Sequence, residues 1–90
     1  CNRCRQHGTF SWSEGERVHI WGSWTPNDQV LDVGIFDRNA GAGYVYRFTG
    51  GTFNRIYTVP WSSNNWTIFV GNPCPPNTET VFYNGDAEEL

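Results

Sequence analysis

The stretch from Gly43 to Pro60 limits the folds open to this chain more than any other segment. Aromatic residues occupy every second position from Tyr44 to Phe48, and aliphatic or polar residues lie between them. Alternation with a period of two is the signature of a β-strand with two unlike faces. Gly50-Gly51 then indicates a tight turn, because glycine adopts positive φ without steric cost. Since residues 52–59 read as a second strand, ended by Pro60, we predict a β-hairpin over residues 43–60.

The rest of the chain repeats this pattern of short alternating runs between turn-forming residues. Five further strands are predicted, at residues 9–13, 17–25, 30–37, 66–71 and 78–84. No window shows helical periodicity. Seven short strands with turn signals every 8–12 residues are typical of an antiparallel β-sandwich. We therefore predict an all-β, antiparallel sandwich or jelly-roll-like domain.

Three of these strands have a clearly apolar face that should point inward. The predicted inward residues are Val18, Ile20, Gly22 and Trp24; Leu31, Val33 and Ile35; and Trp66, Ile68 and Val70. After the last strand, Asn84-Gly85 is expected to form a turn and residues 86–90 an acidic tail. Residues 1–8 are polar, and we expect an N-terminal cysteine arm there, outside a single sandwich domain at residues 9–90.

The charged residues exclude several classes of function. The chain has six arginines, no lysine and a net charge of −3, and no basic patch large enough to follow a phosphate backbone, so we expect no nucleic-acid partner. No apolar run approaches the ~20 residues of a transmembrane helix. His7 and His19 are the only histidines, and neither lies in a nucleophile motif. We therefore expect no enzymatic activity and no cofactor.

Cys1, Cys4 and Cys74 are odd in number, so one thiol is left over if one intrachain disulfide forms. A Cys4–Cys74 bond would close a loop of about 70 residues and stabilise the fold by roughly 4 kcal/mol. Cys1 would then be free to bond another molecule, or to carry a lipid as in a bacterial lipoprotein. In another arrangement, Cys1 and Cys4 both reach a neighbouring subunit. Because the sequence begins at Cys1 and contains no Met, we expect a mature secreted product, extracellular or at a cell surface.

The same cysteines allow one metal hypothesis. Cys1, Cys4, His7 and Cys74 have the ligand count of a structural zinc site. Zinc sites of that kind normally place two ligand pairs on two tight turns, whereas Cys74 stands alone among prolines. Zinc is therefore kept only as an alternative to a disulfide.

Several aromatic residues are candidates for an exposed surface. They are Trp21, Trp61, Tyr46 and Tyr57, together with His19. Such rings form flat platforms on which sugars stack in carbohydrate-binding sandwiches. The same rings would also fill a thin core, or lie buried between subunits, where Trp, Tyr and Arg are enriched.

Three segments resemble a known type of domain. Glu14-Gly-Glu-Arg-Val-His-Ile-Trp-Gly-Ser-Trp24, Leu31-Asp-Val-Gly-Ile-Phe-Asp37 and Trp66-Thr-Ile-Phe-Val-Gly-Asn72 are similar to small secreted bacterial β-sandwiches of the pre-peptidase C-terminal type. The resemblance spans roughly residues 10–84, and it implies an accessory module with a binding or structural role. The cysteine arm and Cys74 lie outside it.

Together these features favour a secreted, non-enzymatic β-sandwich that self-assembles into a fibre or surface layer. Its N-terminal arm would tether subunits through disulfides, and its strand edges, with no lysine to block them, would permit strand addition. The alternatives are a polysaccharide- or surface-binding module, and a lipoprotein anchored at Cys1.

Overall fold

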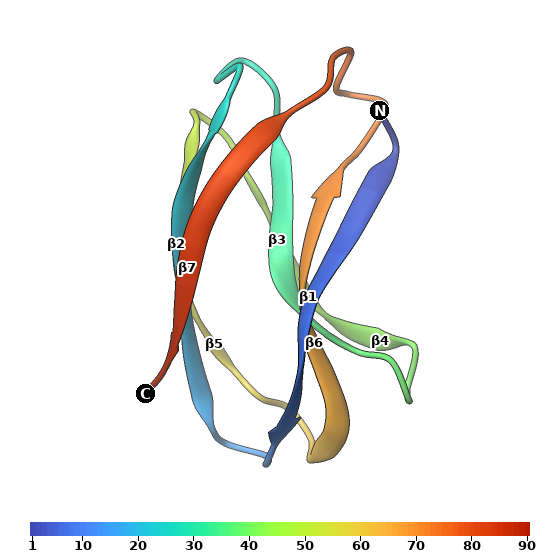
Figure 1. Ribbon diagram of the computed structural model, residues 1–90, viewed down its shortest axis with the longest axis vertical. Helices are drawn as coiled ribbons and strands as arrows, with labels where there is room; N and C mark the ends of the chain where they lie inside the picture. Colours follow the sequence, from blue (N-terminus) through green and yellow to red (C-terminus); the bar gives the residue numbers. More distant parts are fainter.

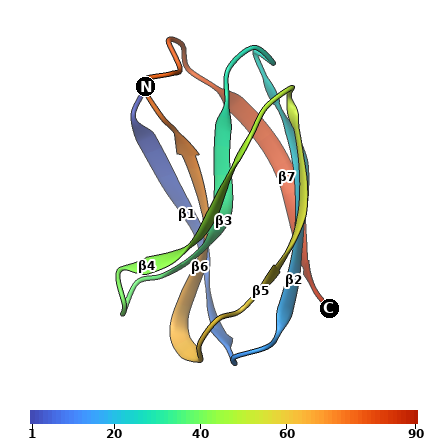
Figure 2. The same cartoon turned by 180° about the vertical axis from the view of Figure 1, so that it is seen from behind.

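The computed structural model describes all residues 1–90 as two antiparallel β-sheets packed face to face (Figures 1 and 2). Its seven strands are β1 (Arg3–Trp12), β2 (Arg17–Thr25), β3 (Leu31–Asp37), β4 (Ala42–Phe48), β5 (Thr52–Thr58), β6 (Ser63–Asn72) and β7 (Phe82–Glu89). One sheet has the strand order β1-β6-β3-β4 and the other β5-β2-β7. No helix is long and apolar enough to cross a membrane. The predicted all-β sandwich of seven antiparallel strands is confirmed.

The core lies between the two sheets and is built from the predicted apolar faces. Val33, Ile35 and Trp66 have no exposed surface, and Val18 and Leu31 have 1%. Burying an aliphatic side chain of this size contributes roughly 1.5–3 kcal/mol. In β6, Ile68 is partly buried and packs against this core. Alternation therefore predicted the inward faces of β2, β3 and β6 correctly.

The predicted hairpin over residues 43–60 is wrong, although both of its strands exist. β4 pairs with β3 in one sheet, and β5 pairs with β2 in the other. Gly50 and Gly51, with φ of 87° and 95°, carry the chain from one sheet to the other (Figure 2). Local alternation identifies a strand but not its partner, and the partner is set by contacts distant in sequence.

The two ends of the chain also extend further into the sheets than the sequence pattern indicates. β1 begins at Arg3 and pairs along β6, so most of the expected arm is part of a strand. β7 continues through the predicted turn at Asn84-Gly85 and through most of the expected acidic tail. Gly85 lies opposite Gly22 of β2, and the ring of Phe53 packs against both glycines. Two facing glycines leave room for that ring, so the strand does not need to turn.

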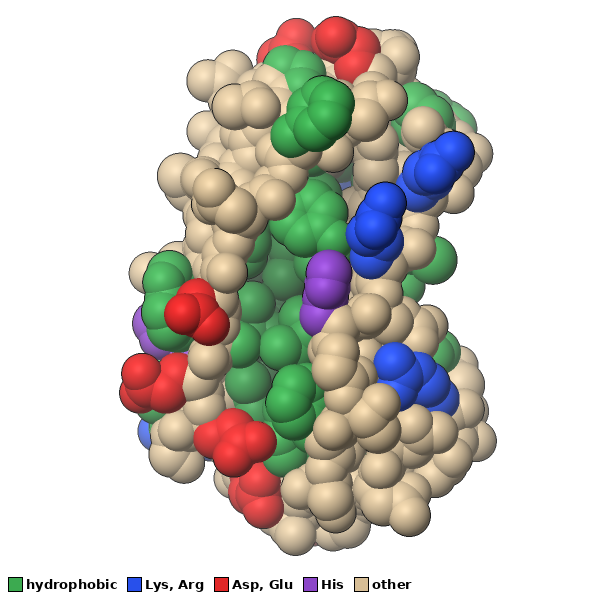
Figure 3. Space-filling model, viewed as in Figure 1, with side chains coloured by type: hydrophobic (Ala, Val, Ile, Leu, Met, Phe, Trp, Pro, Cys, Tyr) green, Lys and Arg blue, Asp and Glu red, His purple; other side chains and the backbone are tan.

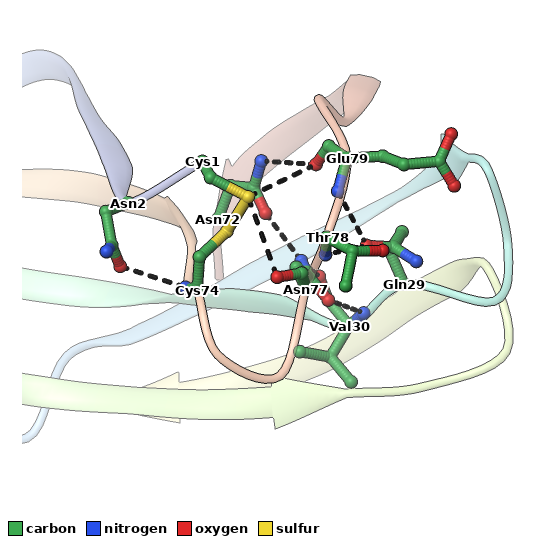
Figure 4. The surroundings of a disulfide bond; sticks show 9 residues. All are labelled: Cys1, Asn2, Gln29, Val30, Asn72, Cys74, Asn77, Thr78 and Glu79. Carbon is green, nitrogen blue, oxygen red and sulfur yellow. Dashed lines mark hydrogen bonds between the residues drawn. A yellow bond between two sulfur atoms is a disulfide. The ribbon is translucent and has the colours of Figure 1, made fainter.

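A disulfide joins Cys1 to Cys74 (Figure 4), not Cys4 to Cys74. In the ladder of β1 and β6, Cys4 lies opposite Gly71 and is exposed with a free thiol, whereas Cys1 precedes the strand and reaches the connector that follows β6. This pairing excludes the zinc alternative, because two of its four ligands are consumed. It also occupies the Cys1 sulfur that a lipid thioether would need.

Hydrogen bonds hold the connector around Cys74 against the sandwich (Figure 4). The backbone amide of Cys74 donates to Asn2 Oδ1 at 2.9 Å. Asn77, only 4% exposed, bonds both backbone groups of Val30 at 2.7 Å. Gln29 Oε1 accepts from the amides of Thr78 and Glu79. The disulfide therefore fastens β1 to a segment that is itself well anchored.

Loss of this disulfide should destabilise the fold, because it closes a loop between residues 73 positions apart. We expect Cys1→Ser to lower the free energy of unfolding by roughly 4 kcal/mol in the chain-entropy model, measured by urea denaturation. Cys4→Ser, which leaves the bond intact, should change stability little. Equal stability of both variants would show that the Cys1–Cys74 bond does not stabilise the fold.

Candidate functional site

The five predicted aromatic-platform residues do not lie together. Trp21 and His19 contact each other on the outer face of β2, with ring centroids 4.6 Å apart and ring planes tilted by 32°. Tyr57 is in the core, only 4% exposed, and donates its hydroxyl hydrogen bond to the carbonyl oxygen of Val33. Burial raises the pKa of Tyr57. Trp61 lies in the loop before β6, and Tyr46 lies on β4. The structure therefore distributes the predicted platform over four separate places.

Trp61 is engaged in an internal hydrogen-bond network. Its indole Nε1 donates to Asp37 Oδ2 at 2.7 Å, and Ser63 Oγ donates to Asp37 Oδ1 at 2.8 Å. The backbone amide of Asn39 also donates to this carboxylate. Burial raises the pKa of Asp37, but these hydrogen bonds outweigh it and hold the pKa below its usual value. Trp61 thus holds the end of β3 against the start of β6, and its N–H is not available to a ligand.

The outer face of the three-stranded sheet keeps an aromatic and polar surface. Trp21 lies between Asn54 of β5 and Asp86 of β7 in the strand register. His19 Nε2 is hydrogen-bonded to Asn54 Oδ1 at 2.6 Å. Both rings remain partly exposed. This face therefore presents two adjacent rings next to an amide and a carboxylate, the groups that bind sugars.

The side of the sandwich between β4 and β5 is open and aromatic. Tyr44 and Tyr46 are 56% and 46% exposed, and Val45 and Ile56 are both 44% exposed. The Arg55 guanidinium lies over the Tyr46 ring at 4.1 Å and joins the two strands across the gap between the sheets. Of the six large hydrophobic side chains that are highly exposed, four lie here; the other two are Phe82 and the last residue, Leu90.

The opposite side, between β1 and β7, holds a cleft of about 510 Å³ (Figure 3). Its floor is apolar and belongs to the core: Ile20, Val33, Phe53, Ile68 and Val70. Figure 3 shows acidic side chains along the β7 side of the cleft and arginines along the β1 side.

Two hydrogen bonds cross from β1 to β7 at this cleft. His7 Nε2 and Tyr83 Oη lie 2.7 Å apart, and Trp12 Nε1 donates to Glu89 Oε1 at 2.7 Å. Between these two contacts, the inward positions of β7 are Gly85 and Ala87, whose small size leaves the cleft open.

Alternation in the sequence predicted none of this cleft, because its walls depend on β1 and β7 being the edges that face each other. In the sequence, the small residues Gly85 and Ala87 at alternate positions could have indicated the cleft, but the pattern Asn84-Gly85 predicts a turn there. No group of three or more His, Cys, Asp or Glu side chains is placed to hold a metal ion. No family model, curated protein or solved structure matches the chain. The function must therefore be argued from these surfaces.

The Asp37 network should make stability depend on pH. Because the folded-state pKa of Asp37 is lowered, its ionised form stabilises the fold above the unfolded pKa of about 3.9, and this contribution is lost as pH falls through the folded value. We expect Asp37→Asn to be less stable than wild type at pH 7, with the difference shrinking below about pH 4. Thermal unfolding of wild type and of Asp37→Asn from pH 7 to pH 2.5 gives the difference in stability at each pH. A difference that stays constant would contradict this assignment.

Proposed function

We propose that the chain is an extracellular, non-enzymatic structural subunit that self-assembles through two contacts at opposite edges of its four-stranded sheet. The first contact is strand addition at β4, and the second is a disulfide between Cys4 residues of two subunits. The exposure of large apolar side chains on the unprotected edge strand β4 is the observation that carries this proposal.

Three of the four edge strands carry features that discourage pairing with another chain. β1 has irregular register between His7 and Trp12, and Arg5 lies opposite the inward-facing Val70. β7 carries the acidic residues Asp86 and Glu88. In β5, an arginine lies opposite Ile20 on the inner face. Bulges, edge charges and inward-pointing charges are the devices by which natural sheets avoid edge-to-edge association.

β4 has none of these devices. Its ladder with β3 is regular from Ala42 to Phe48. Its one charged residue, Arg47, is already paired with Asp32 at 2.9 Å. Tyr44, Val45 and Tyr46 are therefore exposed beside a row of unpaired backbone groups. An edge of this kind is an association site.

Pairing of β4 with β4 of a second copy is two-fold symmetric, and such a contact closes into a dimer. A fibre needs a second contact. In the strand order β1-β6-β3-β4, the strand that carries Cys4 is at the opposite edge of the same sheet. One free thiol per chain can link only two chains. If β4 contacts and Cys4 disulfides alternate, however, that single thiol is enough for an open linear assembly.

An extracellular location is part of the proposal. The Cys1–Cys74 disulfide is compatible with an oxidising compartment. The resemblance to secreted accessory modules of the pre-peptidase C-terminal type would place the chain in the same setting, and it supports a structural or binding role over a catalytic one.

Two substitutions should separate the contacts. Under oxidising conditions we expect wild type to form long assemblies that reductant converts to noncovalent dimers. Cys4→Ser should give noncovalent dimers, and Val45→Lys should give disulfide-linked dimers of twice the 10.3 kDa chain mass, because facing lysines repel at the β4 joint. The double variant should be monomeric. Light scattering and non-reducing gels measure these states.

A matched control tests whether any lysine on an edge strand would act in the same way. Phe82→Lys places the charge on β7, where the original side chain is 69% exposed. It should assemble like wild type. A wild-type protein that is monomeric under oxidising conditions at high concentration would overturn the proposal.

A second candidate function is carbohydrate binding on the outer face of β2. The observation that favours it is the adjacent Trp21–His19 pair beside Asn54 and Asp86. An amphipathic ring with neighbouring hydrogen-bonding groups can hold a sugar by its apolar face and its hydroxyls at once. Assembly at β4 does not cover this face, so both functions can belong to one protein.

Glycan binding predicts a difference between two tryptophans. If a polysaccharide on a broad panel quenches the tryptophan fluorescence, we expect Trp21→Ala to abolish the response. Trp61→Ala should retain it, because that indole is bonded to Asp37. No response to any glycan, or a response lost only in Trp61→Ala, would count against this site.

A further inference from the structure

The cleft between β1 and β7 is a bounded apolar site and not merely an unpaired edge. The His7–Tyr83 and Trp12–Glu89 hydrogen bonds cross it at two points. Between them, the opening leads to core residues, including Val33 and Phe53. A volume of about 510 Å³ lies within the range of small-molecule sites, roughly 300–1,000 Å³.

The surface beside this cleft carries two arginines without acidic partners. Beyond the His7–Tyr83 contact, a second hollow of about 340 Å³ shares Val70 and Tyr83 with the cleft and is lined by Arg3 and Arg5. The single ion pair of the molecule is Arg47–Asp32, so neither guanidinium is neutralised. Both side chains lie beside an apolar channel and are free to bind an anion.

An acidic residue lies at the other end. The carboxylate of Glu89 accepts the Trp12 hydrogen bond there, whereas Asp86 lies opposite Trp21 and faces outward. Along the groove, Arg3 and Arg5 therefore lie at one end, the apolar floor lies in the middle and the carboxylate of Glu89 lies at the other end.

We propose that this cleft binds an amphiphile with an anionic head group and a linear apolar tail. The head group lies at Arg3 and Arg5, and the tail lies in the cleft over Val70 and Ile68. Charge complementarity fixes this orientation, because the reverse one would place the anion beside the carboxylate of Glu89. The tail meets no unpaired charge, since the polar side chains that cross the cleft already bond one another.

A strand from a second copy fits the cleft less well than such a ligand. To lie along the groove, a strand would have to break both the His7–Tyr83 and the Trp12–Glu89 hydrogen bonds. An amphiphile that lies from Arg5 to Ala87 passes only the His7–Tyr83 contact and leaves the Trp12–Glu89 hydrogen bond in place.

Three probes with the same ten-carbon tail test the assignment: decanoate, decyltrimethylammonium and 1-decanol, titrated by calorimetry below their aggregation concentrations. We expect decanoate to bind at least fivefold more tightly than decyltrimethylammonium. Arg5→Gln should weaken decanoate at least fivefold and leave 1-decanol unchanged. Arg17→Gln, an exposed arginine on β2 that does not line either hollow, is the matched control and should leave all three unchanged.

A second variant tests the place of the tail. Ala87→Phe fills the cleft and should abolish binding of all three probes, with folding checked by thermal unfolding. If that variant does not fold, the comparison of Arg5→Gln with Arg17→Gln still decides the question.

Three results would overturn the proposal. Tightest binding of the cation, weakened by Glu89→Gln, would assign the site to cationic amphiphiles. Equal binding of all probes that survives Ala87→Phe would mean adsorption elsewhere on the surface. If sedimentation shows that the apparent binding only accompanies a change in oligomeric state, the cleft belongs to a contact between copies and not to a ligand.

Discussion

Seven strands divided between two open sheets leave four strand edges, and this constraint shapes the whole molecule. The two sheets do not close into a barrel, and no helix covers an edge. Each edge must be protected in some other way, or used. The inward arginines of β1, the acidic residues of β7 and Arg55 of β5 protect three edges at a cost in core packing. β4 carries exposed apolar side chains instead, and for this reason we propose it as the edge of association.

The same constraint explains why polar groups are buried where the sheets meet. Asp37 is 2% exposed at the end of β3, yet every hydrogen bond it needs is supplied by Trp61, Ser63 and backbone amides. No buried side-chain nitrogen or oxygen lacks a partner. A thin core gains little from further apolar burial, so complete hydrogen bonding of its few polar groups contributes to a single ordered structure.

The sequence predicted what depends on local pattern and failed where distant contacts decide. The inward faces of β2 and β3 follow from alternation alone, since side chains of a strand can point only two ways. The partner of β4 does not, because Gly50-Gly51 suits a hairpin turn and a crossing between sheets equally well. Which cysteines pair could not be predicted without the β1–β6 register, in which Cys4 lies out of reach of Cys74. The cleft depended on β7 running straight past Gly85, and only the facing Gly22 and the Phe53 ring explain why it does.

The two proposed surfaces lie on opposite sides of the sandwich, so occupation of one does not exclude the other. Assembly through β4 leaves the β1–β7 cleft open, and a Cys4 link would join subunits on the outer face of β1, because Cys4 alternates with the inward-facing Arg3 and Arg5. An assembly of this kind would carry one ligand cleft per subunit along its length.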